Sequence, residues 1–164
     1  MGLLSGPARR MRREYFLDRI PNGSAVLEVG SGGQWVREYL LKKRIGSYTG
    51  IDLVPPADIV GDIRRWRQLG LKPASYDVVI AFEVIEHVDC LDDCYELLKS
   101  GGWLMVTTPL PHMDWLMRLM EWAGLNQRRT SPHEHLIYLN EVGRFRTRQL
   151  KNVGWVWQWG IFEK

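Results

Sequence analysis

Short apolar runs and longer amphipathic stretches alternate along most of the chain. Five apolar runs have the length and the flanking glycine, proline or polar residues of buried strands, and they lie within residues 25–29, 47–53, 57–63, 75–82 and 102–109. The segments 7–20, 34–44 and 89–99 instead carry apolar residues at helical spacing. Strands that alternate with helices predict an α/β fold, built as a doubly wound, mostly parallel sheet with helices on both faces.

The last residues follow a different pattern. Trp155, Trp157 and Trp159 alternate with Val156 and Gln158, which predicts a final strand with one aromatic face. At the edge of a sheet, such a strand would expose that face and favour pairing with a second copy of the chain. A homodimer is therefore one expectation.

Composition favours an ordinary globular domain. The 164 residues are 45% apolar and 25% charged, and no apolar run approaches the roughly 20 residues of a membrane-spanning helix. The N-terminus lacks the apolar centre of a signal peptide, so we expect a cytoplasmic protein without a membrane span. Cys90 and Cys94 have no second cysteine pair to complete a zinc site, and we expect both to be reduced and structural.

Positive charge is mild overall but clustered. The formal net charge is +3, and arginines gather within residues 9–13, 64–67 and 144–148. Such clusters can meet phosphates. Solvated helix faces are the commoner explanation, and we favour it here.

A glycine-rich loop follows the first predicted strand. The sequence VLEVGSGG places Gly30 and Gly32 directly before a helix, where glycines allow a sharp turn and a close ligand approach. A dinucleotide-binding loop needs a small third residue for the packing of helix on strand. Trp35 stands at that position, which argues against a NAD-dependent oxidoreductase.

Acidic residues stand at the ends of the first three predicted strands. Glu28 precedes the glycines and could hold an ammonium group, although it would repel a pyrophosphate. Asp52, 20 residues beyond Gly32, suits a ribose diol. Asp62 is placed to contact an adenine amino group. Ammonium, ribose and adenine without a phosphate describe S-adenosylmethionine (SAM).

With these residues in place, the sequence resembles the class I, Rossmann-like SAM-dependent methyltransferases. VLEVGSGGQ, GIDLV, VGDI, YDVVIAFEVIEHV and LLKSGGWLMVTTP resemble the family's successive motifs over residues 25–109. Gln34 departs from the family, which usually has a third glycine there. The family's sheet usually has seven strands, whereas the pattern above predicts six, so one C-terminal strand is expected to be missing.

The resemblance implies a set of cofactor contacts. Residues of the glycine loop would line the methionine end, the second motif would hold the ribose, the third the adenine, and the end of the fourth strand would lie beside the sulfonium. The residues implied are Glu28, Val29, Gly30, Ser31, Gly32, Asp52, Leu53, Asp62, Ile63, Phe82 and Glu83. The product would be S-adenosylhomocysteine.

The fourth strand runs into Glu83, Glu86 and His87, and three explanations stay open. The two carboxylates and the imidazole could form part of a Mg²⁺ or Mn²⁺ shell. His87, or a later histidine, could act as a metal-free base, with Glu83 beside it. Alternatively, the acids and the histidine could cap the next helix, with Asp89, and hold the acceptor loop.

A later histidine pair bears on the metal and base hypotheses. SPHEHL supplies His133 and His135. The E-x-x-E-H element resembles one in methyltransferases of ubiquinone-type catechols and one in RNA 2′-O-methyltransferases, where a later histidine joins it. By context His135 is the better match, as catalytic residue or as fourth metal ligand.

We expect the chain to form one SAM-dependent methyltransferase domain over residues 1–164. Residues 1–22 would form an N-terminal helix, 23–109 the cofactor-binding core, and 110–164 the acceptor-side lid and last strand. Resemblance to small methyltransferases favours methyl transfer to a hydroxyl of a small molecule such as a quinone precursor or a sugar. An RNA acceptor is the alternative, and a SAM-binding protein without transferase activity is a second.

Overall fold

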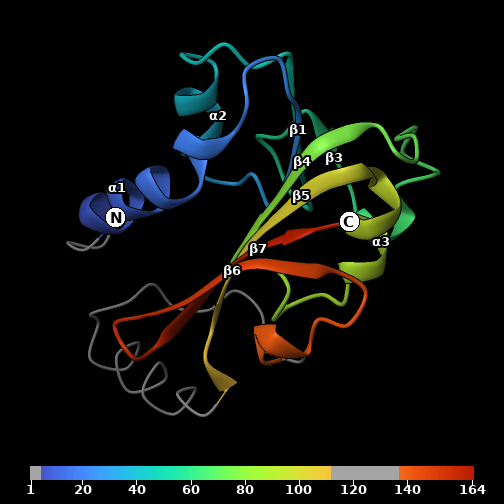
Figure 1. Cartoon of the computed structure of the whole chain (residues 1–164). Helices are drawn as coiled ribbons and strands as arrows, with labels where there is room; N and C mark the ends of the chain where they lie inside the picture. The colour runs from blue at the N-terminus through green and yellow to red at the C-terminus, as the bar shows by residue number, and fades with distance from the viewer. Residues whose placement is uncertain (1–4, 112–136) are drawn as a thin grey trace.

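A single seven-stranded sheet organises the chain, in the order β3-β2-β1-β4-β5-β7-β6 (Figure 1). The computed structural model describes residues 5–111 and 137–164. Its strands are β1 (Ala25–Val29), β2 (Ser47–Asp52), β3 (Ile59–Val60), β4 (Tyr76–Phe82), β5 (Leu98–Pro109), β6 (Arg146–Val153) and β7 (Trp157–Glu163). The first five strands run parallel, and β7 is antiparallel to both β5 and β6.

Helices cover both faces of this sheet, as the sequence predicts (Figure 1). The α-helices are α1 (Ser5–Tyr15), α2 (Trp35–Leu40) and α3 (Leu91–Leu97), and short 3-10 turns span Leu17–Arg19, Ile63–Arg65 and Leu139–Glu141. One core, which includes Phe16 and Leu40, lies under α1 and α2, and the other, which includes Trp66 and Leu97, lies under α3. No helix in the described ranges is long and apolar enough to cross a membrane.

The expectation of a missing strand is wrong. The strand that the pattern did not predict is β6, with the sequence RTRQLKNV, and every residue in it except Val153 is exposed. It shows no apolar alternation because it is an edge strand that buries neither face, and so the hydrophobic pattern cannot reveal it. Its charged side chains are those with which edge strands discourage further pairing.

This edge strand also changes the interpretation of the C-terminal tryptophans. β7 lies between β5 and β6, so its aromatic face is not at the edge of the sheet, and the argument for a homodimer loses its basis. Trp157 and Trp159 pack in the core under α1. Trp155 is instead 87% exposed in the turn before β7, with a φ of 63°, so the three tryptophans do not share one face.

Two further predictions concern α3. Cys90 and Cys94 are buried free thiols, which confirms their structural interpretation. The helix begins at Leu91 with Cys90 at its N-cap, and the Cys90 side chain makes no capping hydrogen bond. The residue before the helix is therefore not Asp89, and the predicted acidic cap is wrong.

Candidate functional site

A hollow of about 380 Å³ opens at the carboxyl ends of β1, β2 and β4. In doubly wound sheets this is the edge at which ligands bind. The predicted cofactor residues that line it are Val29, Gly30, Gly32, Asp52, Leu53, Asp62, Ile63, Phe82 and Glu83. Glu28 and Ser31 are buried behind this lining. The fold thus brings together residues from four separate sequence motifs.

The glycine loop has the backbone that its sequence suggests. Gly30 has a φ of 78°, and a Cβ there would lie 2.5 Å from Cγ2 of Val84. Gln34 is also in the left-handed region, with a φ of 54°, so the position where the family carries glycine keeps a glycine-like conformation. The Gln34 side-chain amide donates to the carbonyls of Ser31 at 2.9 Å and Pro56 at 2.7 Å, which stabilises the loop in this shape.

Asp52 connects the end of β2 to this loop. One carboxylate oxygen accepts a hydrogen bond from the backbone N–H of Gly32 at 2.8 Å, and the other accepts from Val54 at 3.3 Å. A carboxylate has about four lone-pair sites. Asp52 therefore retains acceptor capacity toward the hollow that it lines.

Asp62 has a more constrained place. Its carboxylate accepts from the backbone N–H of Arg64 at 3.0 Å and pairs with the Arg64 guanidinium at 2.6 Å. These hydrogen bonds lower the pKa of Asp62. The carboxylate is thus ionised and oriented by Arg64, which also lines the hollow.

Glu28 is buried and hydrogen-bonded to the Tyr48 hydroxyl. Burial raises its pKa from 4.5 to about 7; the bond from Tyr48 opposes this rise, and the charge of Asp52 adds to it. The same burial, together with the charge of Glu28, raises the pKa of Tyr48. Glu28 therefore changes its charge near neutral pH, directly behind the glycine loop.

The turn after β4 holds the residues for which three explanations were open. Glu83 has a φ of 59° and forms an ion pair with Arg12 of α1. Glu86 is buried and accepts a hydrogen bond from Thr108 at 3.1 Å. His87 lines the hollow. The bond from Thr108 supports a positioning role for Glu86, since it fastens the turn to β5.

The metal hypothesis finds no support in this turn. Within residues 5–111 and 137–164, no three His, Cys, Asp or Glu side chains come together as a metal-ligand set. Glu83 and Glu86 are engaged by Arg12 and Thr108 instead. His133 and His135 lie outside the described residues, and so their predicted roles are not addressed by the structure.

Arg12 is a site residue that the sequence analysis missed. Its guanidinium lies 6.0 Å from the Phe82 ring centroid and 5.9 Å from that of Trp157, beside Glu83. Burial lowers its pKa to about 10, although the charge of Glu86 opposes the change. It therefore stays cationic at neutral pH. The cluster of N-terminal arginines was the available signal, but the pattern did not single out the buried one.

Polar atoms without partners gather near Arg12. Among the described residues, four buried side-chain atoms have no hydrogen-bond partner; Oγ of Ser31 is in the glycine loop, and the other three are Nε of Arg12, Oγ1 of Thr107 and Nε1 of Trp159. Thr107 is the register neighbour of both Phe82 and Trp159, so the three atoms share one region under α1. Unsatisfied buried groups cost stability, and their gathering beside the hollow suggests a ligand-binding role.

Comparisons with known proteins identify the family. A model described as a methyltransferase domain matches residues 8–152. The chain belongs to this family. A ubiquinone biosynthesis O-methyltransferase of Xylella fastidiosa is 32% identical over 118 residues, which cover 60% of this chain and 47% of that protein. The chain thus spans about half the length of the curated relatives it matches.

Solved structures support the same fold. A SAM-dependent methyltransferase from Archaeoglobus fulgidus superposes with a TM-score of 0.66 at 13% identity, covering 98% of this chain and 95% of that chain. One from Mesorhizobium loti gives 0.65 at 12% identity, covering 93% and 97%. At these identities the likeness shows the fold alone. The resemblance to class I methyltransferases, and their Rossmann-like fold, is confirmed.

The methyltransferase family implies SAM as the cofactor, and the hollow fits it. The lining carries the carboxylates of Asp52 and Asp62 and a glycine loop that permits close approach. Asp52 has lone pairs free for hydroxyl donors, as a ribose diol requires. Among the described residues that line the hollow, Arg64 is the one arginine or lysine, and Asp62 neutralises it, so this lining does not favour the pyrophosphate of a dinucleotide.

We predict that Gly30→Ala lowers both stability and SAM affinity. Alanine would be strained at a φ of 78°, and its Cβ would collide with Val84. We expect a loss of about 2 kcal/mol or more in the free energy of unfolding, measured by urea denaturation. Gly70→Ala is a matched control, since it has a similar φ of 82° but no heavy atom within 4 Å of the added Cβ. An equal loss in both variants would contradict the role of the Val84 contact.

We predict that Glu28→Gln changes how stability depends on pH. Between its ordinary pKa of 4.5 and the folded value of about 7, the folded protein holds the Glu28 proton more tightly than the unfolded chain does. This group therefore lowers stability as pH rises through that window, and glutamine removes the effect. Relative to the native chain, the variant should gain about 2 kcal/mol between pH 5 and pH 8. An equal difference in the free energy of unfolding between the variant and the native chain at pH 5 and at pH 8 would contradict this prediction.

We predict that Thr107→Val leaves stability unchanged or raises it by up to about 1 kcal/mol. Valine keeps the shape of threonine and removes a buried hydroxyl that has no partner. The same change should lower methyl transfer if the hydroxyl contacts the acceptor. Thr108→Val is the comparison, because Thr108 donates to buried Glu86 and its loss should destabilise. A clear loss of stability in Thr107→Val would assign the hydroxyl a structural role.

Proposed function

We propose that this domain transfers the methyl group of SAM to a hydroxyl of a small molecule. The observation that carries the proposal is the single hollow in which acidic strand ends meet the glycine loop and the Glu83–His87 turn. The acceptor class is supported by the relatives, which are named ubiquinone biosynthesis O-methyltransferases. The chain covers about half of those proteins, and so their acceptor is not assigned to it directly. We propose the wider class of small-molecule hydroxyls, of which a quinone precursor is one member.

In this proposal the chain's residues divide the cofactor among them. Asp52 and Leu53 hold the ribose, and Asp62 and Ile63 contact the adenine. Phe82 and Glu83 lie at the sulfonium end. Arg12, the cation beside them, binds the carboxylate of the methionine moiety. Glu28, behind the loop, favours the nearby ammonium group most strongly when it is ionised.

Methyl transfer to a hydroxyl also requires that the acceptor lose its proton. As the oxygen–methyl bond forms, the carbon–sulfur bond breaks and leaves a neutral thioether, and the hydroxyl proton must pass to a base. His87 lines the hollow, and an imidazole can accept a proton near neutral pH. We therefore propose His87 as the proton acceptor, with Glu83 positioning the acceptor. A Mg²⁺ or Mn²⁺ requirement is the alternative, and it is tested below.

Calorimetric titration of SAM and S-adenosylhomocysteine tests the cofactor assignment. Both should bind, and Asp52→Asn should weaken each by at least tenfold, since the amide no longer offers two acceptor oxygens to the loop and the ribose. Asp89→Asn is the matched control, because Asp89 is exposed and does not line the hollow. Failure of both ligands to bind the native chain would overturn the proposed function.

Turnover assays then address the acceptor and the metal. A series of catechols and sugars is tested with EDTA and with added Mg²⁺ or Mn²⁺. Activity that persists in EDTA and falls in His87→Gln would support the metal-free base. Activity that appears only with a metal and disappears in Glu83→Gln would support the metal alternative. Turnover of RNA that falls steeply with salt would instead support the RNA acceptor.

We predict that Arg12→Gln weakens SAM binding through the carboxylate. Loss of a charge-assisted hydrogen bond should reduce affinity by roughly tenfold or more. Decarboxylated SAM lacks the group that Arg12 would bind, so its affinity should change less than about threefold. Arg12→Lys should restore part of the SAM affinity, and Arg148→Gln, which changes an exposed arginine of β6, should change neither. Equal losses for both ligands would show that Arg12 acts only through the shape of the site.

A further inference from the structure

A groove between α1 and α2 lies outside the hollow described above. Its volume is about 270 Å³, and it is lined by Arg9, Arg10, Arg13, Lys42 and the rings of Trp35 and Tyr39. We call it the α1–α2 groove. Arg9, Arg10 and Arg13 come from the first predicted helix, where the sequence analysis favoured a solvated face. The structure instead places the guanidinium groups of Arg9 and Arg13 over aromatic rings of α2.

Positive charge in the α1–α2 groove is poorly compensated. Arg10 pairs with Glu14 at 2.9 Å on an exposed helix face. Arg9, Arg13 and Lys42 form no ion pair with a carboxylate of the described residues, and Glu38 is the one acidic residue of the lining. Arg9 and Arg13 are four residues apart on one helix, an arrangement in which like charges repel. The groove therefore holds a net positive charge that a bound anion would neutralise.

Two of these arginines are held in place by aromatic rings. The Arg9 guanidinium lies 5.9 Å from the Trp35 ring centroid, and that of Arg13 lies 5.3 Å from the Tyr39 centroid. All four side chains are half-buried. Stacking on a ring leaves the N–H edge of a guanidinium available for hydrogen bonds, and it reduces the conformational entropy that binding would cost.

The groove is also adjacent to the proposed cofactor site. Trp35 lines the groove and stacks on Phe82, with 6.1 Å between ring centroids and an interplanar angle of 15°. Phe82 in turn lines the hollow. A molecule that places a charged group in the groove would thus lie next to the end of the site at which we place the sulfonium.

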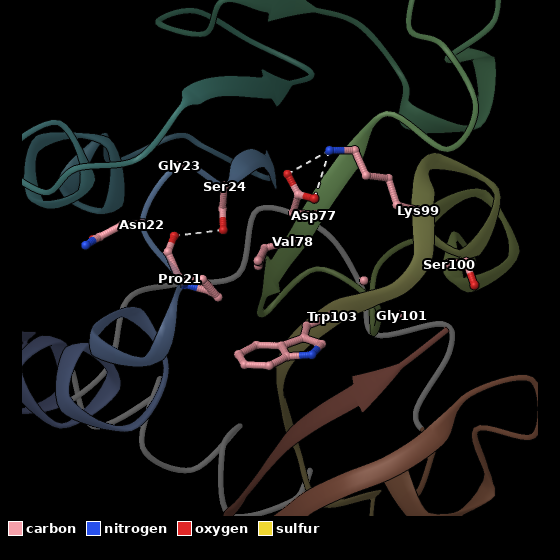
Figure 2. Close-up of a pocket in the computed structure, with 11 residues that line it drawn as sticks. Pro21, Asn22, Gly23, Ser24, Asp77, Val78, Lys99, Ser100, Gly101 and Trp103 are labelled. Atoms are coloured by element: carbon pink, nitrogen blue, oxygen red, sulfur yellow. Dashed lines mark hydrogen bonds and ion pairs between the residues drawn. The ribbon is translucent and has the colours of Figure 1, made fainter.

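A third hollow lies at the amino ends of β1, β4 and β5 (Figure 2). It differs from the groove in its charge. Its volume is about 360 Å³, and its one cationic side chain is Lys99. Both oxygens of Asp77 lie 2.8 Å from Nζ of Lys99, so that charge is already neutralised. The indole of Trp103 completes a lining that has no free charge for a ligand.

We infer that the α1–α2 groove binds the phosphate or diphosphate group of a small molecule. A single carboxylate would leave most of the charge of Arg9, Arg13 and Lys42 uncompensated, whereas a phosphate dianion or a diphosphate neutralises it. Phosphate oxygens also match the paired N–H groups of arginine. Given its position beside Phe82, the methyl acceptor is the simplest bearer of that group, and this last step rests on the proposed function.

Titration with inorganic pyrophosphate tests the groove without reference to methyl transfer. We expect binding by calorimetry in a buffer whose ionic strength is held constant with NaCl, and at least a tenfold loss in the double variant Arg13→Gln/Lys42→Gln. Lys72→Gln/Arg148→Gln removes the same charge from exposed positions outside the groove and the hollow and should bind like the native chain. SAM is titrated into all three proteins, and its affinity should stay within about threefold, which shows that the variants are folded.

The outcomes separate this inference from the proposed function. No pyrophosphate binding to the native chain, or an equal loss in both double variants, overturns the small-molecule inference whatever SAM does. Pyrophosphate binding without SAM binding supports the groove and overturns the methyltransferase proposal. Vesicles containing phosphatidylglycerol distinguish the source of the phosphate. If the native chain binds them but not pyrophosphate, the groove recognises a membrane surface, and the small-molecule inference is wrong.

Discussion

The hydrogen bond from the backbone N–H of Gly32 to the Asp52 carboxylate connects the two strand ends on which the site depends. Parallel pairing of β1 with β2 brings these ends to the same edge of the sheet. The bond then fixes the glycine loop relative to the carboxylate that we assign to the ribose. Without this bond, the left-handed backbone at Gly30 and Gln34 would be less constrained, and the glycine loop would be less well positioned beside Asp52.

Charge is arranged around this edge in two opposite zones. Acidic side chains of β1, β2 and the turn after β4 surround the hollow, while the cations of α1 stand on its other side. The Arg12–Glu83 ion pair joins the zones. A cofactor that carries a sulfonium, an ammonium and a carboxylate suits such a boundary, because each of its charges finds an opposite charge nearby. The same division explains why the α1–α2 groove, only one aromatic side chain away, selects anions.

Sequence patterns predict most of the sheet, because β1, β4 and much of β5 are buried on both faces and appear in the sequence as apolar runs. The motif residues converge as predicted because the carboxyl ends of parallel strands meet at one edge. Other features depend on tertiary contacts that a local pattern does not contain. β6 carries no apolar signal, since it buries neither face. Arg12 differs from its arginine neighbours only through its burial against Phe82 and Trp157, and Asp62 is oriented by Arg64 through a contact that spacing alone does not specify.

The acceptor side shows how an energetic defect can indicate function. Burial of Thr107 Oγ1, Trp159 Nε1 and Arg12 Nε without partners costs free energy, and apolar residues of similar shape would stabilise this region better. A structural role alone does not explain three such atoms beside the Glu83–His87 turn. A ligand that presents oxygen atoms would satisfy all three, since each can act as a donor. These groups would then discriminate between acceptors, because an acceptor without suitably placed oxygens would leave the same groups unpaired.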